Sequence, residues 1–188
     1  MDTNALTSRL MRVLRFDASV YREIAADQGA LPQALTIVVI AVILYSIPSF
    51  VAGQGAAAGI VLVALGIIGG LIGFGLYSAV AAFIAKTFFQ GKTEFQEMAR
   101  TLGFAYAWQA VGILGFIPIL GGLIAFVGWI GAVVSGLIAL RESAEFDTVK
   151  ALITVVIAAI VAGFATFCAT GIIGTPIILA LGLASGGQ

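Results

Sequence analysis

The stretch AAGIVLVALGIIGGLIGFGLYSAVAAFIA, residues 57–85, is the longest uninterrupted apolar run in the chain. It contains no Asp, Glu, Lys, Arg, Asn, Gln or Pro. As an α-helix with a rise of about 1.5 Å per residue it would extend roughly 43 Å, which exceeds the roughly 30 Å of bilayer hydrocarbon. The stretch therefore predicts a helix that crosses a membrane, tilted or with its ends in the interface.

Four glycines of this run, Gly66, Gly69, Gly70 and Gly73, fall within about a quarter turn when residues are projected at roughly 100° each. They form two overlapping GxxxG pairs. Because no hydrophobic force joins helices inside lipid, small residues that allow close backbone approach favour their association. We therefore predict a helix-packing seam along these glycines. The alternative is that they reflect only the general abundance of glycine in membrane helices.

The composition of the whole chain agrees with a membrane location. Of 188 residues, 61% are hydrophobic and 10% are charged, which excludes a water-soluble domain because the apolar side chains exceed any core they could form. The fold class expected is an all-α integral membrane bundle. The chain has no histidine, and its one cysteine, Cys168, lies in an apolar run. We therefore expect no disulfide, metal site or cofactor, and the zero net charge gives no indication of nucleic-acid binding.

Residues 1–31 form the longest polar stretch and have a helical amphipathic pattern. The apolar side consists of Leu6, Leu10, Val13, Leu14, Val20, Tyr21 and Ile24. Asp17 falls on this side, so we expect two short helices that meet near Phe16 and Asp17, with Asp17 capping the second. Arginines occupy the opposite side and predict contact with anionic lipid headgroups; they are Arg9, Arg12, Arg15 and Arg22. A solvated lead-in without lipid preference is the alternative.

Residues 32–188 are expected to form a five-helix transmembrane domain. The expected spans are 32–52, 57–85, the two arms of the uncharged stretch 102–140, and 151–173. The stretch 102–140 is too long for one crossing, and Pro118, Gly121 and Gly122 predict a break at 116–122. Each arm is short, so a hairpin that dips only part-way is the alternative to two full crossings.

The connections between these spans carry turn and capping signals. The loop 53–55 is so short that the first two spans must be antiparallel neighbours. Thr93 and Gln96 have the spacing of a capping box and predict a helix from about Glu94. Asp147 is the expected cap of the last span. The sequence Gly-Thr-Pro at 174–176 predicts a kink or an end in that span.

The basic residues predict one orientation in the membrane. All nine lie before the first span or in the second and fourth connections: Arg9, Arg12, Arg15, Arg22, Lys86, Lys92, Arg100, Arg141 and Lys150. By the positive-inside rule these segments are cytoplasmic. The N-terminus is then in the cytoplasm, and five crossings place the C-terminus outside.

The expected spans contain no ionisable side chain of the kind that intramembrane catalysis or ion coupling requires. Gln109 is the most polar side chain within them. It predicts either an interhelical hydrogen bond, the favoured interpretation, or a polar contact in a substrate path. The carboxylates at 23–27, 94–97 and 142–147 alternate with basic residues, which favours caps and ion pairs over a metal site. We expect no enzymatic activity.

Four stretches of the chain match the pattern of a known family: FDASVYREIAADQGALPQAL, FFQGKTEFQEMARTLGFAYAW, GILGFIPILGGLIAFVGWI and LRESAEFDTVKAL. With these stretches in this order the chain resembles a bacterial member of the Yip family, the Ypt/Rab-interacting multi-pass membrane proteins. The resemblance implies five helices, a cytoplasmic N-terminus, no enzymatic activity and, for a bacterial member, the cytoplasmic membrane.

Two motifs of the eukaryotic members are altered here. An acidic Gly-Pro motif ahead of the first span corresponds to Asp27, Gly29 and Pro32. A Gly-Tyr motif ending in Pro corresponds to Gly103, Phe104 and Tyr106, with Trp108 where similar proteins often have Pro. These departures argue against binding to small GTPases.

The sequence thus favours a non-enzymatic membrane-organising, adaptor or accessory protein. Its expected partners are the lipid bilayer and other integral membrane proteins or a larger membrane complex. The alternative is a small passive transporter or lipid-handling protein with a polar path near Gln109.

Overall fold

The computed structural model describes residues 3–51, 56–117 and 119–180, and all regular structure within them is helical. The elements, in chain order, are α1 (Thr3–Leu14), α2 (Ala18–Ala26), α3 (Ala30–Val51), α4 (Ala56–Phe89), α5 (Phe95–Ala105), the 3₁₀-helix η1 (Tyr106–Phe116), α6 (Gly121–Ala144) and α7 (Thr148–Ala180). The expected all-α class is confirmed.

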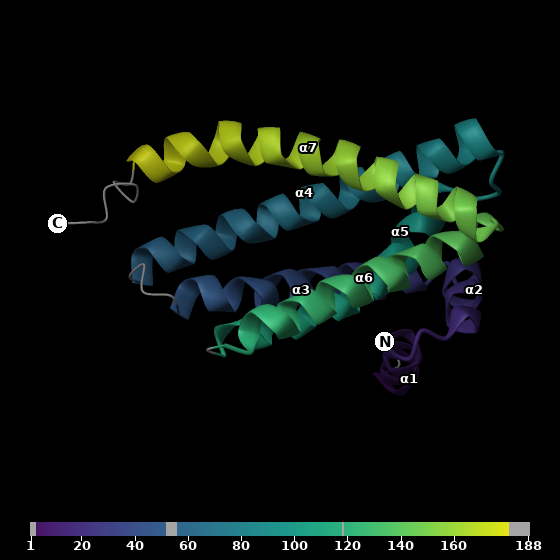
Figure 1. Cartoon of the computed structure of the whole chain (residues 1–188), viewed down its shortest axis with the longest axis horizontal. Coiled ribbons are helices and arrows are strands. Elements are labelled where there is room, and N and C mark those ends of the chain that lie inside the picture. The colour runs from purple at the N-terminus through teal and green to yellow at the C-terminus, as the bar shows by residue number, and fades with distance from the viewer. Residues whose placement is uncertain (1–2, 52–55, 118, 181–188) are drawn as a thin grey trace.

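The long helices α3, α4, α6 and α7 run along the long axis of the molecule, and α1 and α2 lie at one end of it (Figure 1). Helix α4 packs against α3 and α7, while η1 packs between α3 and α6. Helices α3 and α4 are neighbours, as the short loop 53–55 predicts; the loop itself lies outside the described residues. The last turns of α7 lie at the end opposite to α1 and α2 (Figure 1).

Three described helices are long and apolar enough to cross a membrane: Gly59–Phe89, Gly121–Ala144 and Thr148–Pro176. The described apolar part of the first expected span, Ala30–Tyr45, is shorter. The third expected span is divided between α5 and η1. Three of the five expected spans therefore meet the criterion of length and hydropathy, and the full set of five stays a prediction.

The change from α-helix to 3₁₀-helix at Tyr106 is not predicted by the apolar pattern. It coincides with the packing of Trp108 into a notch of α6. A Cβ atom on Gly131 would overlap the Trp108 ring at Cε3, and one on Gly128 would lie 3.2 Å from the Trp108 carbonyl oxygen. Because the two glycines have no side chains, both the Trp108 ring and the backbone of η1 can pack closely against α6.

The expected helix start at about Glu94 is confirmed, but the capping box expected there is wrong, and of the kink or end expected at 174–176 the end does not occur. Helix α5 begins at Phe95 with Glu94 as N-cap, and the hydroxyl of Thr93 donates to the Glu94 carbonyl, so the expected capping box does not form. Thr93 is buried, which takes its side chain away from the helix start. Helix α7 does not end at 174–176 but continues past Pro176 to Ala180. In an apolar environment, proline removes one hydrogen bond, whereas leaving the helix would expose several backbone groups.

Other local predictions are confirmed. The chain breaks between α1 and α2 at Phe16, which has a left-handed φ of 58°, and Asp17 is the N-cap of α2. Its carboxylate accepts a hydrogen bond of 2.9 Å from the Ser19 backbone N–H. Asp147 likewise accepts from the Lys150 backbone N–H at 2.9 Å at the start of α7. Helix η1 ends at Phe116 and α6 begins at Gly121, so the two helices are separated within the expected 116–122.

The core is concentrated near α1 and α2. Its largest fully buried side chains come from α2, α5 and α6 and include Tyr21, Ile24, Met98, Leu102, Phe104 and Leu140. By contrast, the outer faces of the long helices expose many large apolar side chains. A chain with buried packing at one end and apolar flanks elsewhere is typical of a bundle whose flanks contact lipid.

Candidate functional site

The charged residues lie in three segments, 1–31, 86–100 and 141–150, and none occurs between these segments or after them. In the described structure the three segments come together at the end of the bundle that carries α1 and α2 (Figure 1). We call this region the charged cap: α1, α2, the connections α4–α5 and α6–α7, and the turns of α4, α5, α6 and α7 next to these connections. It is the candidate functional site because it concentrates the ionisable groups.

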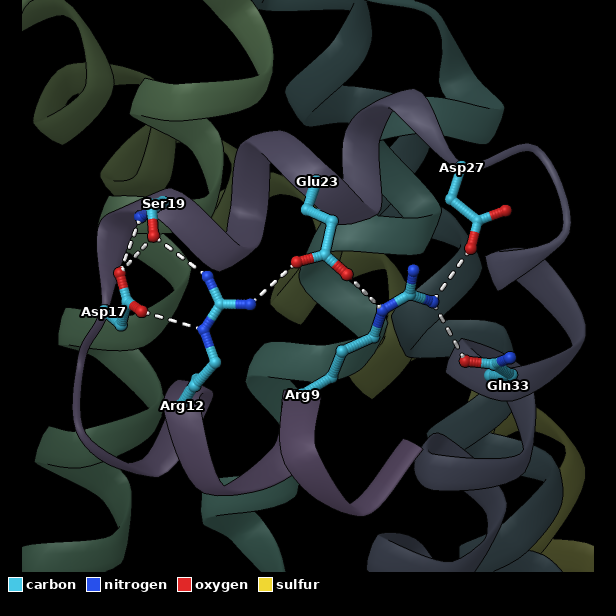
Figure 2. A network of polar contacts seen from close by, with 7 residues as sticks. All are labelled: Arg9, Arg12, Asp17, Ser19, Glu23, Asp27 and Gln33. Carbon is cyan, nitrogen blue, oxygen red and sulfur yellow. Dashed lines mark hydrogen bonds and ion pairs between the residues drawn. The ribbon is translucent and has the colours of Figure 1, made fainter. Parts of the chain in front are cut away.

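Helices α1 and α2 are joined by a continuous chain of ion pairs (Figure 2). Glu23 on α2 accepts from both arginines of α1, with Arg9 Nε at 2.8 Å and Arg12 Nη1 at 2.7 Å. Arg9 Nη1 also lies 2.8 Å from Asp27 Oδ2, and Arg12 Nε lies 2.9 Å from Asp17 Oδ2. The two arginines therefore face the acidic side of α2 and fix the angle between the two helices.

These contacts lower the pKa values of the three carboxyl groups. Hydrogen bonds from the Ser19 hydroxyl and then from Arg12 lower the pKa of Asp17 to about 2. Hydrogen bonds from Arg9 and Arg12 lower the pKa of Glu23, and the hydrogen bond from Arg9 lowers the pKa of Asp27. Each carboxyl group is stabilised in its charged form. The chain of ion pairs is thus intact at neutral pH.

Helix α2 is attached to α6 by a buried polar contact. The Tyr21 hydroxyl is hydrogen-bonded to the Ser135 hydroxyl, and both side chains are fully buried. Burial raises the pKa of Tyr21 to about 12, so its hydroxyl stays protonated over the physiological range. At the edge of the same contact, Arg22 Nε lies 2.9 Å from Glu142 Oε2 on α6. The cap is therefore packed onto the bundle as part of its core.

Arg100 on α5 provides a second attachment for α2. Its side chain is buried, and Nη2 donates a hydrogen bond of 2.6 Å to the carbonyl oxygen of Ala25 in the last turn of α2. A cation at a helix C-terminus satisfies a free carbonyl and interacts favourably with the helix dipole. Among the described residues, Nε of Arg100 has no hydrogen-bond acceptor. Sequence reasoning missed this role; the signal available was the position of Arg100 directly before the uncharged stretch.

Gln109 on η1 lines two hollows in the bundle. One has a volume of about 180 Å³ and includes Tyr77, Tyr106 and Trp129 in its lining. The other has a volume of about 260 Å³ and is lined by Tyr45, Trp108, Gln109, Ala125, Gly128 and Trp129. Both hollows are largely apolar and aromatic, with the Gln109 amide as a polar group common to them.

A model of the Yip1 domain matches residues 11–170, which is most of the chain. The chain belongs to the Yip1 family. No curated protein and no solved structure matches it. The matched region runs from the second half of α1 to α7 and so includes α2 with its carboxylates, α5 with Arg100, and η1 with Gln109. The charged cap is therefore largely a part of the Yip1 domain.

The four arginines for which lipid contact is predicted have different surroundings, and Arg9 precedes the matched residues of the Yip1 domain. Arg9 and Arg12 face α2, and Arg22 pairs with Glu142. Arg15 is exposed and forms no ion pair with the part of the chain that the structure describes. Contact of these side chains with lipid headgroups stays a prediction, and Arg15 is the arginine most available for it.

The glycine stripe of α4 faces two neighbouring helices. A Cβ atom on Gly69 would lie 3.0 Å from Thr170 Cγ2, and one on Gly73 would lie 3.2 Å from Thr166 Oγ1, both on α7. On Gly70 it would lie 2.7 Å from Val42 Cγ2 on α3. Gly66 and Gly69 line an apolar groove of about 410 Å³ between α4 and α7. The stripe lies in the first half and middle of α4, and α4 begins at the end of the bundle opposite to α1 and α2 (Figure 1).

Among the described residues, no group of three or more His, Cys, Asp or Glu side chains could hold a metal ion. Most of the described carboxylates of the cap pair with arginine or lysine instead, as in the pair between Lys92 and Glu145 at 3.3 Å. The chemistry that this region supports is recognition by charge and hydrogen bonding.

Proposed function

We propose that this Yip1-family chain is a non-enzymatic adaptor or accessory subunit of the bacterial cytoplasmic membrane. It would bind other integral membrane proteins or a larger membrane complex, and it would present the charged cap to the cytoplasm. The observation that carries the proposal is the segregation of all charged residues into the three segments that form the cap. Catalysis or ion coupling within the membrane normally requires an ionisable group at depth. Recognition at the cap requires none.

A five-span topology supports this one-sided arrangement. The third arm, residues 102–116, is short for an α-helix, but most of it is the 3₁₀-helix η1. With rises of about 1.5 Å per α-helical and about 2.0 Å per 3₁₀ residue, it would extend roughly 28 Å, close to the hydrocarbon thickness. Five crossings would leave the N-terminus and all basic residues in the cytoplasm and the C-terminus outside.

The topology is tested by the sidedness of single cysteines in a Cys168→Ser background. The single variants Lys92→Cys and Arg141→Cys should react with a membrane-impermeant maleimide that is added on the same side of the membrane. Labelling of the two positions from opposite sides would overturn both the topology and the proposed role of the cap.

The adaptor role is tested by photo-crosslinking in native membranes. A photoreactive residue at Lys92, whose side chain is 81% exposed on the cap, should give an adduct with the protein that co-purifies in mild detergent. Phe164, exposed on the outer face of α7, is the matched position away from the cap. Lys92→Glu should reduce recovery of the partner, and Phe164→Leu should leave it unchanged. Purification of the chain alone, with no adduct at either position, would contradict the proposal.

The two hollows beside Gln109 favour a second candidate function, passive transport or lipid handling. In this case the Gln109 amide and the aromatic side chains would line a path for a largely apolar solute. The chain reconstituted in liposomes would then give a flux that Gln109→Leu abolishes and Gln109→Asn reduces less. Equal flux through empty liposomes and liposomes with the protein would remove this candidate.

A further inference from the structure

Helix α1 carries an apolar strip that the bundle does not cover. Leu6, Leu10 and Val13 pack against the core, whereas Met11 is 49% exposed and Leu14 is 37% exposed. At roughly 100° per residue, Met11 and Leu14 lie about 60° apart on one side of the helix. That side is distinct from the one through which Arg9 and Arg12 reach α2. We call Met11 and Leu14 the apolar strip of α1.

The contacts of α1 place it beside the apolar part of the bundle. The ring of Phe16, two residues after Leu14, stacks on the ring of Trp108 with centroids 4.9 Å apart. Trp108 lies within the uncharged stretch of residues 102–140. Helix α1 also makes a few contacts with η1, α5 and α6. The helix therefore lies at a depth where uncharged sequence has begun, and its uncovered side faces away from the bundle.

The ion pairs with α2 fix which side of α1 points outward. Arg9 and Arg12 both bind Glu23, so rotation of α1 about its axis would break several contacts at once. These two arginines are also neutralised by their partners. The outward side therefore carries Met11 and Leu14 with Thr7 between them, and the exposed polar residues next to this strip are Asn4, Ser8 and Arg15.

We propose that the apolar strip of α1 inserts into the boundary between headgroups and acyl chains of the bilayer that surrounds the bundle. The contact is made by Met11 and Leu14, and Ser8 and Arg15 remain on the aqueous side of the helix. This interaction surface goes beyond the proposed adaptor role and does not depend on any protein partner. It differs from attraction to anionic headgroups, because the arginines nearest to α2 are already paired.

This contact should not depend on the headgroup charge of the lipid. Burial of apolar side chains is independent of headgroup charge, whereas attraction of arginines to anionic lipid weakens with added salt. Insertion of the strip should therefore be the same in neutral and anionic bilayers, at low and at high salt. It requires only that α1 remain attached to α2.

The test uses the full chain with Cys168→Ser in lipid nanodiscs. Single cysteines replace Met11, Leu14 or Ser8 and carry an environment-sensitive fluorophore, with quenchers attached to the lipid chains. Probes at Met11 and Leu14 should be quenched severalfold more than the probe at Ser8, in phosphatidylcholine alone and with added phosphatidylglycerol. Equal quenching at Met11 and Ser8 would overturn the proposal. Quenching that appears only with phosphatidylglycerol and disappears in salt would also overturn it.

The unsubstituted protein allows a second measurement that no labelling can perturb. Hydrogen peroxide oxidises a methionine that water reaches. Met11 in nanodiscs should oxidise severalfold more slowly than a methionine in a short unstructured peptide, although half of its surface is uncovered by protein. Met98, which is fully buried, gives the lower limit of the rate. Oxidation of Met11 at the rate of the peptide would contradict insertion.

Discussion

The two ends of the bundle are built in different ways. At the cap end, α2, α5 and α6 enclose fully buried side chains such as Tyr21 and Phe104, and ion pairs connect α1 to α2. At the far end, α4 and α7 enclose an apolar groove, and large side chains such as Phe167 and Ile172 are about three-quarters exposed. The cap end resembles the interior of a water-soluble protein. The far end leaves apolar surface for contact with lipid or another helix.

This difference shows where the chain can form specific contacts by itself. Polar groups at the cap are paired with defined geometry, and close packing makes each of them sensitive to substitution. At the far end, small residues permit close approach but leave few directional contacts. Substitutions at the cap end should therefore lower the free energy of unfolding more than substitutions at the far end.

The largest effect is expected for Gly103→Leu on α5. A Cβ atom on Gly103 would lie 2.7 Å from Cβ of Ala34 on α3, and 3.2 Å from its Cα, so a side chain would force the two helices apart. Such overpacking should cost about 3 kcal/mol and lower the thermal midpoint in detergent. The control is Gly75→Ala on α4, which meets nothing within 4 Å and should not destabilise the chain. Equal midpoints for the two variants would contradict the close packing.

The next effect concerns the contact of α2 with α6. Tyr21→Phe removes the hydroxyl that bonds Ser135 and leaves the serine buried without this partner. The expected loss is about 1–2 kcal/mol in the free energy of unfolding. The double variant Tyr21→Phe/Ser135→Ala should recover part of this loss, as measured in a double-mutant cycle. Additive effects of the two substitutions would show that the hydroxyls are not coupled.

The ion pairs between α1 and α2 should have a smaller effect. Glu23→Gln weakens the contacts with Arg9 and Arg12, which are partly exposed, so the expected cost is about 1 kcal/mol. Hydrogen exchange of α1 amides should then be faster by about fivefold, while exchange in α7 is unchanged. Glu94→Gln, at an exposed glutamate of the α4–α5 connection, is the matched control. Unchanged exchange in α1 would contradict the role of Glu23.

Acid should loosen α1 through the same carboxyl groups. The pKa values of Asp17, Glu23 and Asp27 are lowered in the folded chain, that of Asp17 to about 2. Their contribution is therefore fully present above the unfolded pKa of about 4 and is lost as the pH falls through the folded values. Amide exchange of α1, corrected for intrinsic rates, should accelerate between about pH 4 and pH 2. Asp17→Asn should make this acceleration smaller, and an acceleration that begins near neutral pH would exclude these groups as its cause.

The smallest effect is expected at the far end. Gly69→Ala brings a methyl group to 3.0 Å from Thr170 Cγ2. Because the groove lies next to this contact, a small shift of α4 relative to α7 can relieve the close approach. The gain in helix propensity, about 1 kcal/mol, offsets this shift, so the net change should be under about 1 kcal/mol. The difference between the thermal midpoints of the Gly69→Ala and Gly75→Ala variants measures this net change in stability. A loss as large as that of Gly103→Leu would remove the distinction between the two ends.

Some features of the candidate site were predictable because they depend on residues close in the chain. The apolar runs predict the long helices, and the amphipathic pattern of residues 1–31 predicts two helices that meet at Phe16 and Asp17. The caps at Asp17 and Asp147 depend on a side chain and a backbone N–H two or three residues away. In each case the physical cause is local.

Other features could not be predicted from the pattern. The capping box at Thr93 fails because tertiary packing buries the side chain, and α7 continues through Pro176 because of its surroundings. Nothing in the pattern selects Glu23 as the common partner of Arg9 and Arg12. These outcomes depend on segments that meet only in the folded chain.

The sequence by itself determined that this protein is a helical membrane protein whose charged residues fall in three segments, because hydropathy and charge are properties of the run of residues itself. Only the tertiary structure decided which charges pair, that Arg100 binds the end of α2, and that Tyr21 reaches Ser135 from 114 residues away. Such contacts depend on the relative position of packed helices. The same helical pattern is compatible with many such positions, and side-chain volume and hydrogen-bond geometry select among them.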